Sequence, residues 1–445
     1  MTPVAKSSGG RPPTRLFPQL KPRPHHRESD NVAGNQRARL YAAMIQAIAA
    51  SGYAGTSTRQ LAAMAGVSRK TLYDEFGGKE AYFLATYDVI ALRAVQRVKA
   101  AYLSEKDWTR QLHAAFAAFA AEVVDQPKAA RLALVEALGA GPAALAEMER
   151  VSSVFESLIR SSFGRVSDGV SIPPLIVRGI VGGISRVARQ LLIEHREGEL
   201  PSLADTLVEW ALTYRSPAAT LLKAPPSPRG PARRAAGRLH ILTDDDDHAR
   251  ILSAAARLAA EKGFPTLSVA QIVQAAGVSD RVFFELYETK EDCFLASYDR
   301  MGAEVVRYAA EAARARADRL DSVHHGINAL MNRVAFDRVF ARCAFMEVFA
   351  LGPKGIDRRS RLMDSFAALL MSQAPAGERP SEVVADAIVG AVWQIAHCYI
   401  ARDATHRLAE LADHASYLVL APMIGGEAAM ERILTKPMAS TKELK

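Results

Sequence analysis

A chain of 445 residues is too long for one ordinary core and fits two to four domains of the usual size. Hydrophobic residues make up 49% of it and aromatic residues only 7%, and alanine dominates many runs, which favours close-packed helices over sheets. The three cysteines lack the paired spacings of zinc sites and disulfide frameworks, and apolar runs such as Ala114–Ala121 are far shorter than a bilayer span. We therefore expect an all-α cytoplasmic protein with no signal peptide and no membrane segment.

The basic residues are concentrated in two segments. Residues 1–36 carry a net charge of +4 and residues 216–240 carry +5, so the rest of the chain carries −1 of the total of +8. Both segments are rich in Pro, Gly, Ala and Arg, a composition that does not build a core. We expect a disordered basic tail over 1–36 and a linker over 216–247. Their charge could follow a phosphate backbone, or could simply keep the chain soluble.

The chain repeats itself. Arg37–Asp88 aligns without a gap to His248–Asp299 at a constant offset of 211 residues, which also pairs Glu136 with Glu347. Further on the offset is 208, as for Ile180 and Ile388, so the whole unit is duplicated. We therefore expect two equivalent units, each with a first domain, at 37–88 and 248–299, and a second helical domain, at 89–215 and 300–435.

The first repeat has the pattern of a helix-turn-helix. A face of Leu40, Met44, Ala47 and Ile48 predicts a first helix, ended by Gly52. A second helix, capped by Ser57, runs to a tight turn at Gly66, where a positive φ is required. Ser68 caps a third helix, with Leu72 and Phe76 facing inward. Polar side chains and free N–H groups then converge at its N-terminal end, as in helices that read base edges and grip phosphates.

The run Ala65-Gly66-Val67-Ser68, then Thr71-Leu72-Tyr73, Phe76 and Lys79-Glu80, resembles the signature of the TetR (tetracycline-repressor-like) family. The resemblance implies three N-terminal DNA-binding helices and a larger helical domain that dimerises and usually holds a small-molecule pocket. It also implies contacts with double-stranded operator DNA. By this resemblance Ser57, Tyr73 and Lys79 contact phosphates, and Arg69, Lys70 and Thr71 approach bases or backbone, with Arg59 and Ser68 beside them. Tyr73 could instead simply pack, and Lys79 could pair with Glu75.

The second repeat departs from this pattern. Asp280, Arg281 and Phe284 stand where the first repeat has Arg69, Lys70 and Tyr73, and residues 268–287 carry a net charge of −1 against +1 for 57–76. We expect weaker phosphate binding there, although an aspartate can still accept a hydrogen bond from cytosine. A second reader of different specificity and a degraded one both remain open. Its candidate DNA-contacting residues are Ser268, Gln271, Ser279, Asp280, Arg281, Phe284 and Lys290.

Two fused units can present two recognition helices without a second chain, so we expect an intramolecular pseudo-dimer reading an imperfect palindrome. Its interface is expected to combine Leu175–Ile193 and Leu203–Tyr214 with Val383–Ile400 and Leu408–Leu420. Gly179, Gly182, Gly183 and Gly390 would allow the helices to approach closely. A dimer of chains, each contributing two units, is the alternative.

The family resemblance further implies a pocket in each regulatory domain for a small, apolar effector. Candidate lining residues are Trp108, His113, Phe116 and Phe119 in the first unit, and Phe336, Phe340, Phe345, Trp393, His397 and Tyr399 in the second. We expect no metal, no cofactor and no enzymatic activity, because the sequence has none of the usual ligand spacings or catalytic motifs. The sequence thus predicts a cytoplasmic DNA-binding transcriptional regulator located at the nucleoid. The family resemblance favours a repressor that is released by its effector over an activator. The alternative is a ligand-binding or interaction scaffold with a degraded second DNA-binding unit.

Overall fold

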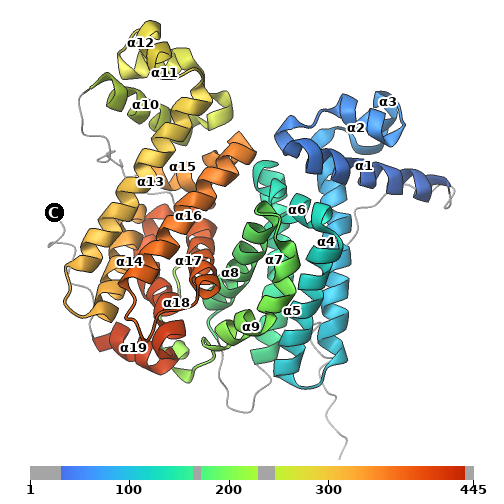
Figure 1. Ribbon diagram of the computed structural model, residues 1–445. Coiled ribbons are helices and arrows are strands. Elements are labelled where there is room, and N and C mark those ends of the chain that lie inside the picture. Colours follow the sequence, from blue (N-terminus) through green and yellow to red (C-terminus); the bar gives the residue numbers. More distant parts are fainter. Residues whose placement is uncertain (1–31, 164–171, 229–245, 436–445) are drawn as a thin grey trace, which may run out of the picture.

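The computed structural model describes residues 32–163, 172–228 and 246–435, and these ranges contain helices and connecting turns without a β-strand (Figure 1). The expectation of a tandem all-α fold is confirmed. The first unit comprises α1 (Val32–Gly55), α2 (Thr58–Ala65), α3 (Arg69–Phe76), α4 (Lys79–Ser104), α5 (Trp108–Asp125), α6 (Pro127–Leu134), η1 (Glu136–Gly139), α7 (Pro142–Phe163), α8 (Pro174–Ile193), η2 (Glu197–Leu203), α9 (Ala204–Leu212) and η3 (Pro217–Leu221).

The second unit repeats this order. It comprises α10 (Asp247–Lys262), η4 (Phe264–Thr266), α11 (Val269–Ala276), α12 (Asp280–Leu286), α13 (Lys290–Arg314), α14 (Arg319–Phe336), α15 (Arg338–Phe345), η5 (Glu347–Leu351), α16 (Pro353–Gln373), α17 (Glu382–Ile400), η6 (Thr405–Leu411), α18 (Ala412–Ile424) and α19 (Gly426–Thr435). The sequence offsets pair α4 with α13, α7 with α16, and α8 with α17.

The expected domain boundaries differ from the helices in four places. Those at 88/89 and 299/300 fall inside α4 and α13, so one continuous helix joins the DNA-binding and regulatory parts of each unit. Helix α1 already begins at Val32, within the expected tail. Part of the expected linker is ordered as well, since Pro217–Leu221 forms η3 with Ala219 buried against the second unit's α19. Residues 1–31 and 229–245, which make up the rest of the tail and most of the linker, lie outside the described residues.

The first helix has the face that its sequence predicts. Leu40, Met44, Ala47 and Ile48 are all buried, and the helical geometry breaks at Gly52, where φ is 66°. These residues pack with Leu61, Leu72 and Tyr82 in a core that is separate from the main one. In the second unit the corresponding side chains belong to the main core, which runs on through the regulatory helices.

Helices α8 and α17 cross at the centre of the molecule, between the two units (Figure 1). Their closest approach is made of reciprocal pairs. A Cβ on Gly182 would lie 2.3 Å from Gln394 Cβ, and a Cβ on Gly390 would lie 2.5 Å from Arg186 Cβ. Because Gln394 and Arg186 are equivalent positions of the repeat, the two contacts mirror each other. Only glycine lets backbones come this close, and these are among the glycines expected to do so.

Polar contacts tie the same faces together. The buried guanidinium of Arg186 pairs with Asp364 and with Asp386 (3.4 Å), both from the second unit. Tyr214, which follows α9, donates from its hydroxyl to the carbonyl of Leu418 in α18 at 2.7 Å. Helices α8 and α9 and helices α17 and α18 are the segments that the sequence analysis expected at this interface.

Within the described ranges, α17 alone is long and apolar enough to cross a membrane by length and composition. It is also largely buried, packing on α8, α16 and α18. A buried helix between two packed units needs apolar residues around most of its circumference, which accounts for its hydropathy.

Candidate nucleic-acid interfaces and ligand cavity

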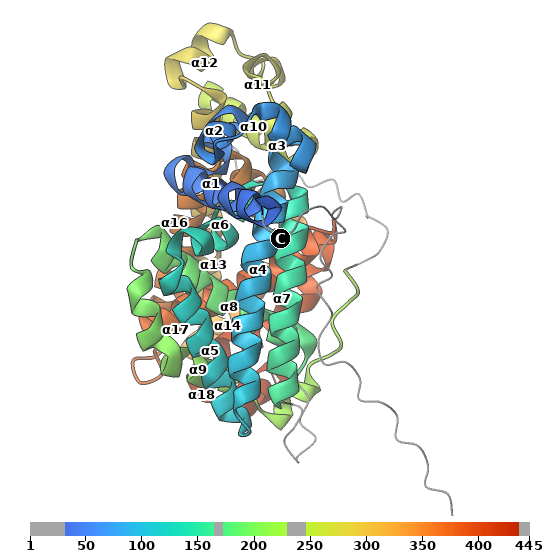
Figure 2. The ribbon, with the colours of Figure 1, turned by 90° about the vertical axis from the view of Figure 1, so that its right-hand side faces the viewer.

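The two helix-turn-helix domains lie at the same end of the molecule, above the long regulatory helices, in both views of the ribbon (Figure 1, Figure 2). In each, the first short helix ends in a glycine with left-handed backbone, Gly66 (φ 66°) and Gly277 (φ 67°). Each turn is followed by a serine whose side chain caps the recognition helix. The turn geometry predicted at Gly66 is therefore present, and it recurs in the second unit.

Helix α3 presents polar side chains at its exposed N-terminal end. Ser68 accepts a hydrogen bond from the Thr71 amide at 3.0 Å and lies 2.8 Å from its hydroxyl. Arg69 and Lys70 are exposed, and Tyr73 is 52% exposed, while Leu72 is fully buried. Tyr73 therefore faces solvent and does not pack into the core. An exposed cationic first turn with free N–H groups favours binding of phosphate and base edges.

The remaining candidates around α2 divide into exposed and internal groups. Ser57 accepts from the Gln60 amide at 3.2 Å as the cap of α2, and Arg59 is exposed beside it. Lys79 is different, because its ammonium donates to the Tyr53 carbonyl at 2.7 Å and lies 4.2 Å above the Tyr53 ring. Glu75 pairs with Arg37 at 3.6 Å, so the expected alternative of a Lys79–Glu75 pair is wrong.

Helix α12 presents different chemistry. Asp280 is exposed, and Arg281 forms an ion pair with Glu285 at 2.8 Å within the same helix. Phe284 is 57% exposed where the first unit has Tyr73, and Phe283 is buried beneath it. Ser279 caps α12 at the Val282 amide (3.3 Å), and Lys290 repeats the internal role of Lys79 by donating to the Leu267 carbonyl at 2.7 Å.

Ser268 and Gln271 form a reciprocal capping box at the start of α11. Gln271 donates its backbone amide to the Ser268 hydroxyl at 3.3 Å and accepts from the Ser268 amide at 3.0 Å. Both groups thus stabilise the helix end locally. The second unit offers fewer free cations to DNA than the first, which agrees with its net charge.

A buried glutamate links each helix-turn-helix to its regulatory domain. The sequence showed only that Glu136 and Glu347 are equivalent positions of the repeat. Glu136 accepts from the Tyr53 amide at 3.0 Å, just after the break at Gly52, and Glu347 accepts from the Phe264 amide at 2.9 Å. An arginine of the preceding helix pairs with each carboxylate, Arg131 at 3.7 Å and Arg342 at 3.0 Å. Movement of α6 or α15 would therefore reach the helix-turn-helix through this contact.

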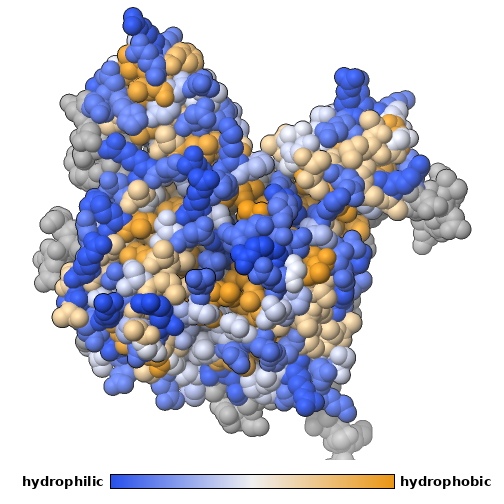
Figure 3. Space-filling model, in the orientation of Figure 1, coloured by the Kyte–Doolittle hydropathy of each residue, from blue (hydrophilic) through white to orange (hydrophobic). Residues whose placement is uncertain are grey.

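The regulatory domains enclose two unequal cavities. The larger, of about 380 Å³, lies mainly in the first unit among α4, α5, α7 and α8, and is completed by residues of α16 and α17. The smaller, of about 100 Å³, lies within the second unit and has an almost wholly apolar lining. Hydrophobic residues also gather on the surface where the two units meet, between hydrophilic rims (Figure 3).

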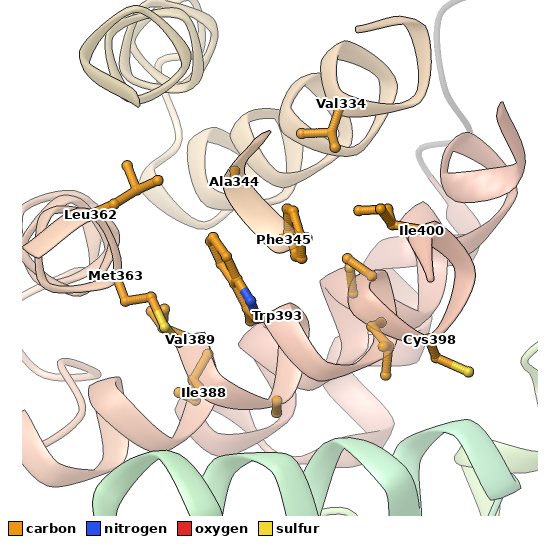
Figure 4. Close-up of a cluster of buried hydrophobic side chains, with 14 of the residues drawn as sticks. Val334, Ala344, Phe345, Leu362, Met363, Ile388, Val389, Trp393, Cys398 and Ile400 are labelled. Carbon is orange, nitrogen blue, oxygen red and sulfur yellow. The ribbon is translucent and has the colours of Figure 1, made fainter. Parts of the chain in front are cut away.

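Two lining positions carry larger side chains in the second unit than in the first. Phe345 stacks on Trp393 with ring centroids 3.9 Å apart, and Figure 4 shows the two rings beside each other. The equivalent residues of the first unit, at the same offsets, are Leu134 and Ser185, and both line the larger cavity. The added volume of the two aromatic side chains is consistent with the smaller cavity of the second unit.

The expected lining residues are only partly at the cavities. Phe116, Phe119 and His397 line the larger cavity, Phe340 and Phe345 the smaller, and Trp393 lies between both. Four candidates lie outside both cavities, namely Trp108, His113, Phe336 and Tyr399.

These four have other surroundings. Arg215 lies 4.5 Å above the Trp108 ring, and His113 lies 3.3 Å from Asp205. Phe336 is 60% exposed at the end of α14, and the Tyr399 hydroxyl donates to the Pro226 carbonyl at 2.6 Å. Aromatic character alone selected them, whereas position on the helix face decides what lines a cavity.

Four arginines of the larger cavity were missed by the sequence analysis, namely Arg178, Arg189, Arg359 and Arg402. A signal was present for at least one of them. Arg359 falls on the same helical face as the buried Ile356 and Met363, three residues before it and four after it. A charged residue on an otherwise apolar helix face is the sequence pattern of a buried ion. No cluster of three or more metal-ligating side chains is found in the described ranges.

Each of the two helix-turn-helix domains is continued by a helical domain with a cavity, so the whole architecture is duplicated. Residues 40–86 and 251–297 both match the family described as bacterial regulatory proteins, tetR family. The family match thus covers the helix-turn-helix part of both units. No curated protein sequence matches the chain.

Comparison with solved structures finds proteins that are similar to part of this chain. The transcriptional regulator FadR from Bacillus subtilis, in complex with stearoyl-CoA, is 15% identical, with a TM-score of 0.36, over 39% of this chain and 96% of its own. FadR of Bacillus halodurans is 18% identical, with a TM-score of 0.36, over 39% and 97%. A TetR-like transcriptional regulator from Rhodococcus sp. RHA1 is 20% identical, with a TM-score of 0.34, over 40% and 95%.

Proposed function

We propose that this protein is a sequence-specific DNA-binding transcriptional regulator that acts as an intramolecular pseudo-dimer. In this proposal α3 and α12 read two unequal half-sites of one operator. The observation that carries it is the reciprocal packing of α8 on α17, which joins two helix-turn-helix domains at one end of a single chain. Since the family resemblance implies that the larger helical domain dimerises, a fused pair of units supplies both readers without a second chain.

The proposed mode of action is repression relieved by a small-molecule effector in the larger cavity. Repression requires only that the protein binds tightly enough to occlude a promoter. The family resemblance also favours repression over activation. Two features support relief by a ligand. The cavity lies between helices of both units, and the glutamate contacts at Tyr53 and Phe264 join the regulatory helices to the DNA-binding domains. A ligand that binds one arrangement of the units more tightly shifts the population toward it.

DNA selection from a random library at stated salt tests this proposal, with the intact chain compared with Arg69→Ala/Lys70→Ala and with Arg281→Ala. The intact chain should select an imperfect palindrome, and each variant should lose preference at a different half-site. Selection of a perfect palindrome that needs both readers would contradict the unequal-reader proposal. A molar mass of one chain per operator, by light scattering, distinguishes the pseudo-dimer from a dimer of chains.

A second candidate is a scaffold in which only the first unit binds DNA. It is favoured by α12, where Arg281 is engaged with Glu285 and where Phe284 and Leu286 are 57% and 45% exposed. Exposed apolar side chains on a recognition helix suit a protein partner at least as well as DNA. In the same selection, a half-site preference that is lost in Arg69→Ala/Lys70→Ala and unchanged in Arg281→Ala would favour this scaffold.

A further inference from the structure

The larger cavity contains a buried arginine with no counter-charge. Arg359, on α16, is 5% exposed, and its guanidinium lies over the rings of Phe349 (5.5 Å) and Trp393 (5.1 Å). Its Nε is buried without a partner, and in the described ranges no hydrogen bond or ion pair reaches this side chain. A guanidinium carries five N–H donors, and a buried cation without an acceptor is costly. The native fold therefore retains a charge that its own residues do not satisfy.

The groups near Arg359 in the cavity include a second buried arginine and two buried ring nitrogens without hydrogen-bond partners. Arg189 is 7% exposed and donates from its Nε to the Leu134 carbonyl at 2.7 Å. The Nε2 of His397 and the Nε1 of Trp393 are buried without partners. Burial and the neighbouring Arg189 and Arg186 place the pKa of Arg359 well below its usual range, and burial lowers the pKa of His397 to about 4. We call this part of the cavity, where the cations Arg189 and Arg359 lie with the neutral Trp393 and His397, the cationic end.

The acids of the cavity do not neutralise the cationic end. Glu156 is held by Arg178 at 3.0 Å, and Glu149 is shared between Arg178 and Arg402. Four arginines and two glutamates line the cavity, which leaves a net charge of +2 with His397 neutral. The excess is at Arg189 and Arg359, because Arg178 and Arg402 are the ones already paired.

The rest of the cavity is apolar and belongs mostly to the first unit. Side chains of α4, α5 and α7 line it, including Val98, Leu112, Phe116, Phe119 and Phe155. A space of this size is within the usual range of small-molecule pockets, in which an apolar body is buried and a few polar groups fix its orientation.

We infer that this cavity binds one amphipathic carboxylate per chain, with its apolar body among α4, α5 and α7 and its carboxylate on Arg359 and Arg189. Guanidinium and carboxylate match in shape and charge, and their hydrogen bonds are among the strong ones. The ligand would thereby join the second unit's α16 to the first unit's α7. The inference rests on the proposed role of this cavity as the effector site and names the chemistry of the effector.

The repeat itself indicates that there is a single such site. The position equivalent to Arg359 in the first unit is Met148, and in the second unit the stacked Phe345 and Trp393 line a cavity of only about 100 Å³ with an apolar lining. Arg359→Met therefore gives the second unit the residue that the first unit already accommodates, which makes it a conservative test.

The test uses the intact chain without DNA, titrated calorimetrically with decanoate and with decan-1-ol, which share an apolar body. We expect one decanoate per chain and at least roughly tenfold weaker binding of the alcohol, as follows from the loss of charged hydrogen bonds. Arg359→Met should weaken decanoate binding about ten- to a hundredfold and leave decan-1-ol binding unchanged. Arg361→Met, which removes a 65% exposed arginine paired with Asp357 at 2.9 Å, is the matched control and should bind like the native chain.

Thermal unfolding keeps the result interpretable. Removal of an unsatisfied buried cation should leave the Tm of the ligand-free protein unchanged or higher. Equal affinity of the native chain for both probes, no binding of decanoate, or undiminished discrimination in Arg359→Met each overturns the inference. Decanoate binding that leaves DNA affinity unchanged contradicts effector release but supports this site, whereas intact DNA selection without decanoate binding overturns the site alone.

Discussion

The contact between α8 and α17 predicts that Gly182→Val separates the two units. A Cβ at this position would lie 2.3 Å from Gln394 Cβ, 2.7 Å from its Cγ and 3.2 Å from the Gly390 carbonyl oxygen. The nearest atom is a Cβ fixed to the helix backbone and not the end of a flexible side chain. To reach an ordinary contact of about 3.5–4 Å, the two helices must therefore move apart by more than about 1 Å.

The size of the effect can be worked from packing. Overpacking of a close-packed interface costs about 1–3 kcal/mol, and the slightly better helix propensity of valine over glycine offsets only a few tenths of that. Each kcal/mol lowers Tm by about 2–4 °C in domains of 150–250 residues, so a fall of several degrees is expected. On the proposed mode of binding, the displaced half-site spacing should also weaken operator binding by the intact chain.

Thermal unfolding followed by circular dichroism measures the first effect, and titration of a selected operator measures the second. Gly198→Val is the control, because Gly198 is exposed on η2 and a Cβ there meets nothing within 4 Å. Equal Tm values for Gly182→Val and Gly198→Val would refute the reasoning, since they would mean that α8 and α17 are not in contact at Gly182.

Three further predictions concern the internal hydrogen bond of Lys79, the buried contacts of Glu347, and His397 in the cationic end. Lys79→Met should lower Tm by the loss of a charged hydrogen bond, about 1.5–3 kcal/mol, whereas the exposed Lys70→Met should leave Tm unchanged and reduce the salt slope of DNA binding by about 1. Glu347→Gln should lower Tm more than the exposed Glu285→Gln, because it removes the charge that pairs with Arg342 beside a buried amide contact, and equal losses would contradict this. His397 has its pKa lowered to about 4 by burial, with Arg359, Arg189 and Arg402 adding to the shift and Glu149 opposing it. The unfolded chain therefore binds a proton that the folded chain excludes, and stability should fall by up to about 3 kcal/mol as pH drops from about 6.5 to 4. In His397→Asn the free energy of unfolding, measured by thermal unfolding over this pH range, should depend less on pH. An unchanged dependence on pH would mean that groups other than His397 cause the loss of stability.

Patterns that depend on local geometry could be predicted from the sequence alone. The buried face of α1, the left-handed Gly66, the serine caps and the glycines of α8 and α17 each follow from backbone sterics or helical periodicity. The repeat added long-range information, because a segment duplicated in one chain must bury the same faces twice. The fold and the helix-turn-helix segments could therefore be predicted from the sequence.

What could not be predicted depends on which side chains meet across the fold. The ammonium of Lys79 lies on the Tyr53 ring, and nothing within the local run Phe76–Glu80 indicates that partner, which is 26 residues away. Trp108 and His113 were chosen for their residue type, yet Leu112 and Phe116 occupy the face that meets the cavity. The unpaired state of Arg359 is a property of the packed interior and has no sequence pattern of its own.

The two units have diverged in complementary ways. The first has the recognition helix with a cationic first turn and the larger cavity, and the second has the acidic recognition helix, the smaller cavity and the arginine that completes the cavity of the first. A second asymmetry lies at Gly52, where an added Cβ would come within 3.3 Å of Pro353 Cγ of the second unit, whereas the nearest atoms to an added Cβ at the equivalent Gly263 are Glu347 and Pro265 of its own unit. At this position, therefore, the first helix-turn-helix domain lies against the second unit, whereas the second one lies against its own. Helix α16 carries both Pro353 and Arg359. A change in its position would therefore displace the first helix-turn-helix domain, which is the one predicted to bind DNA more tightly.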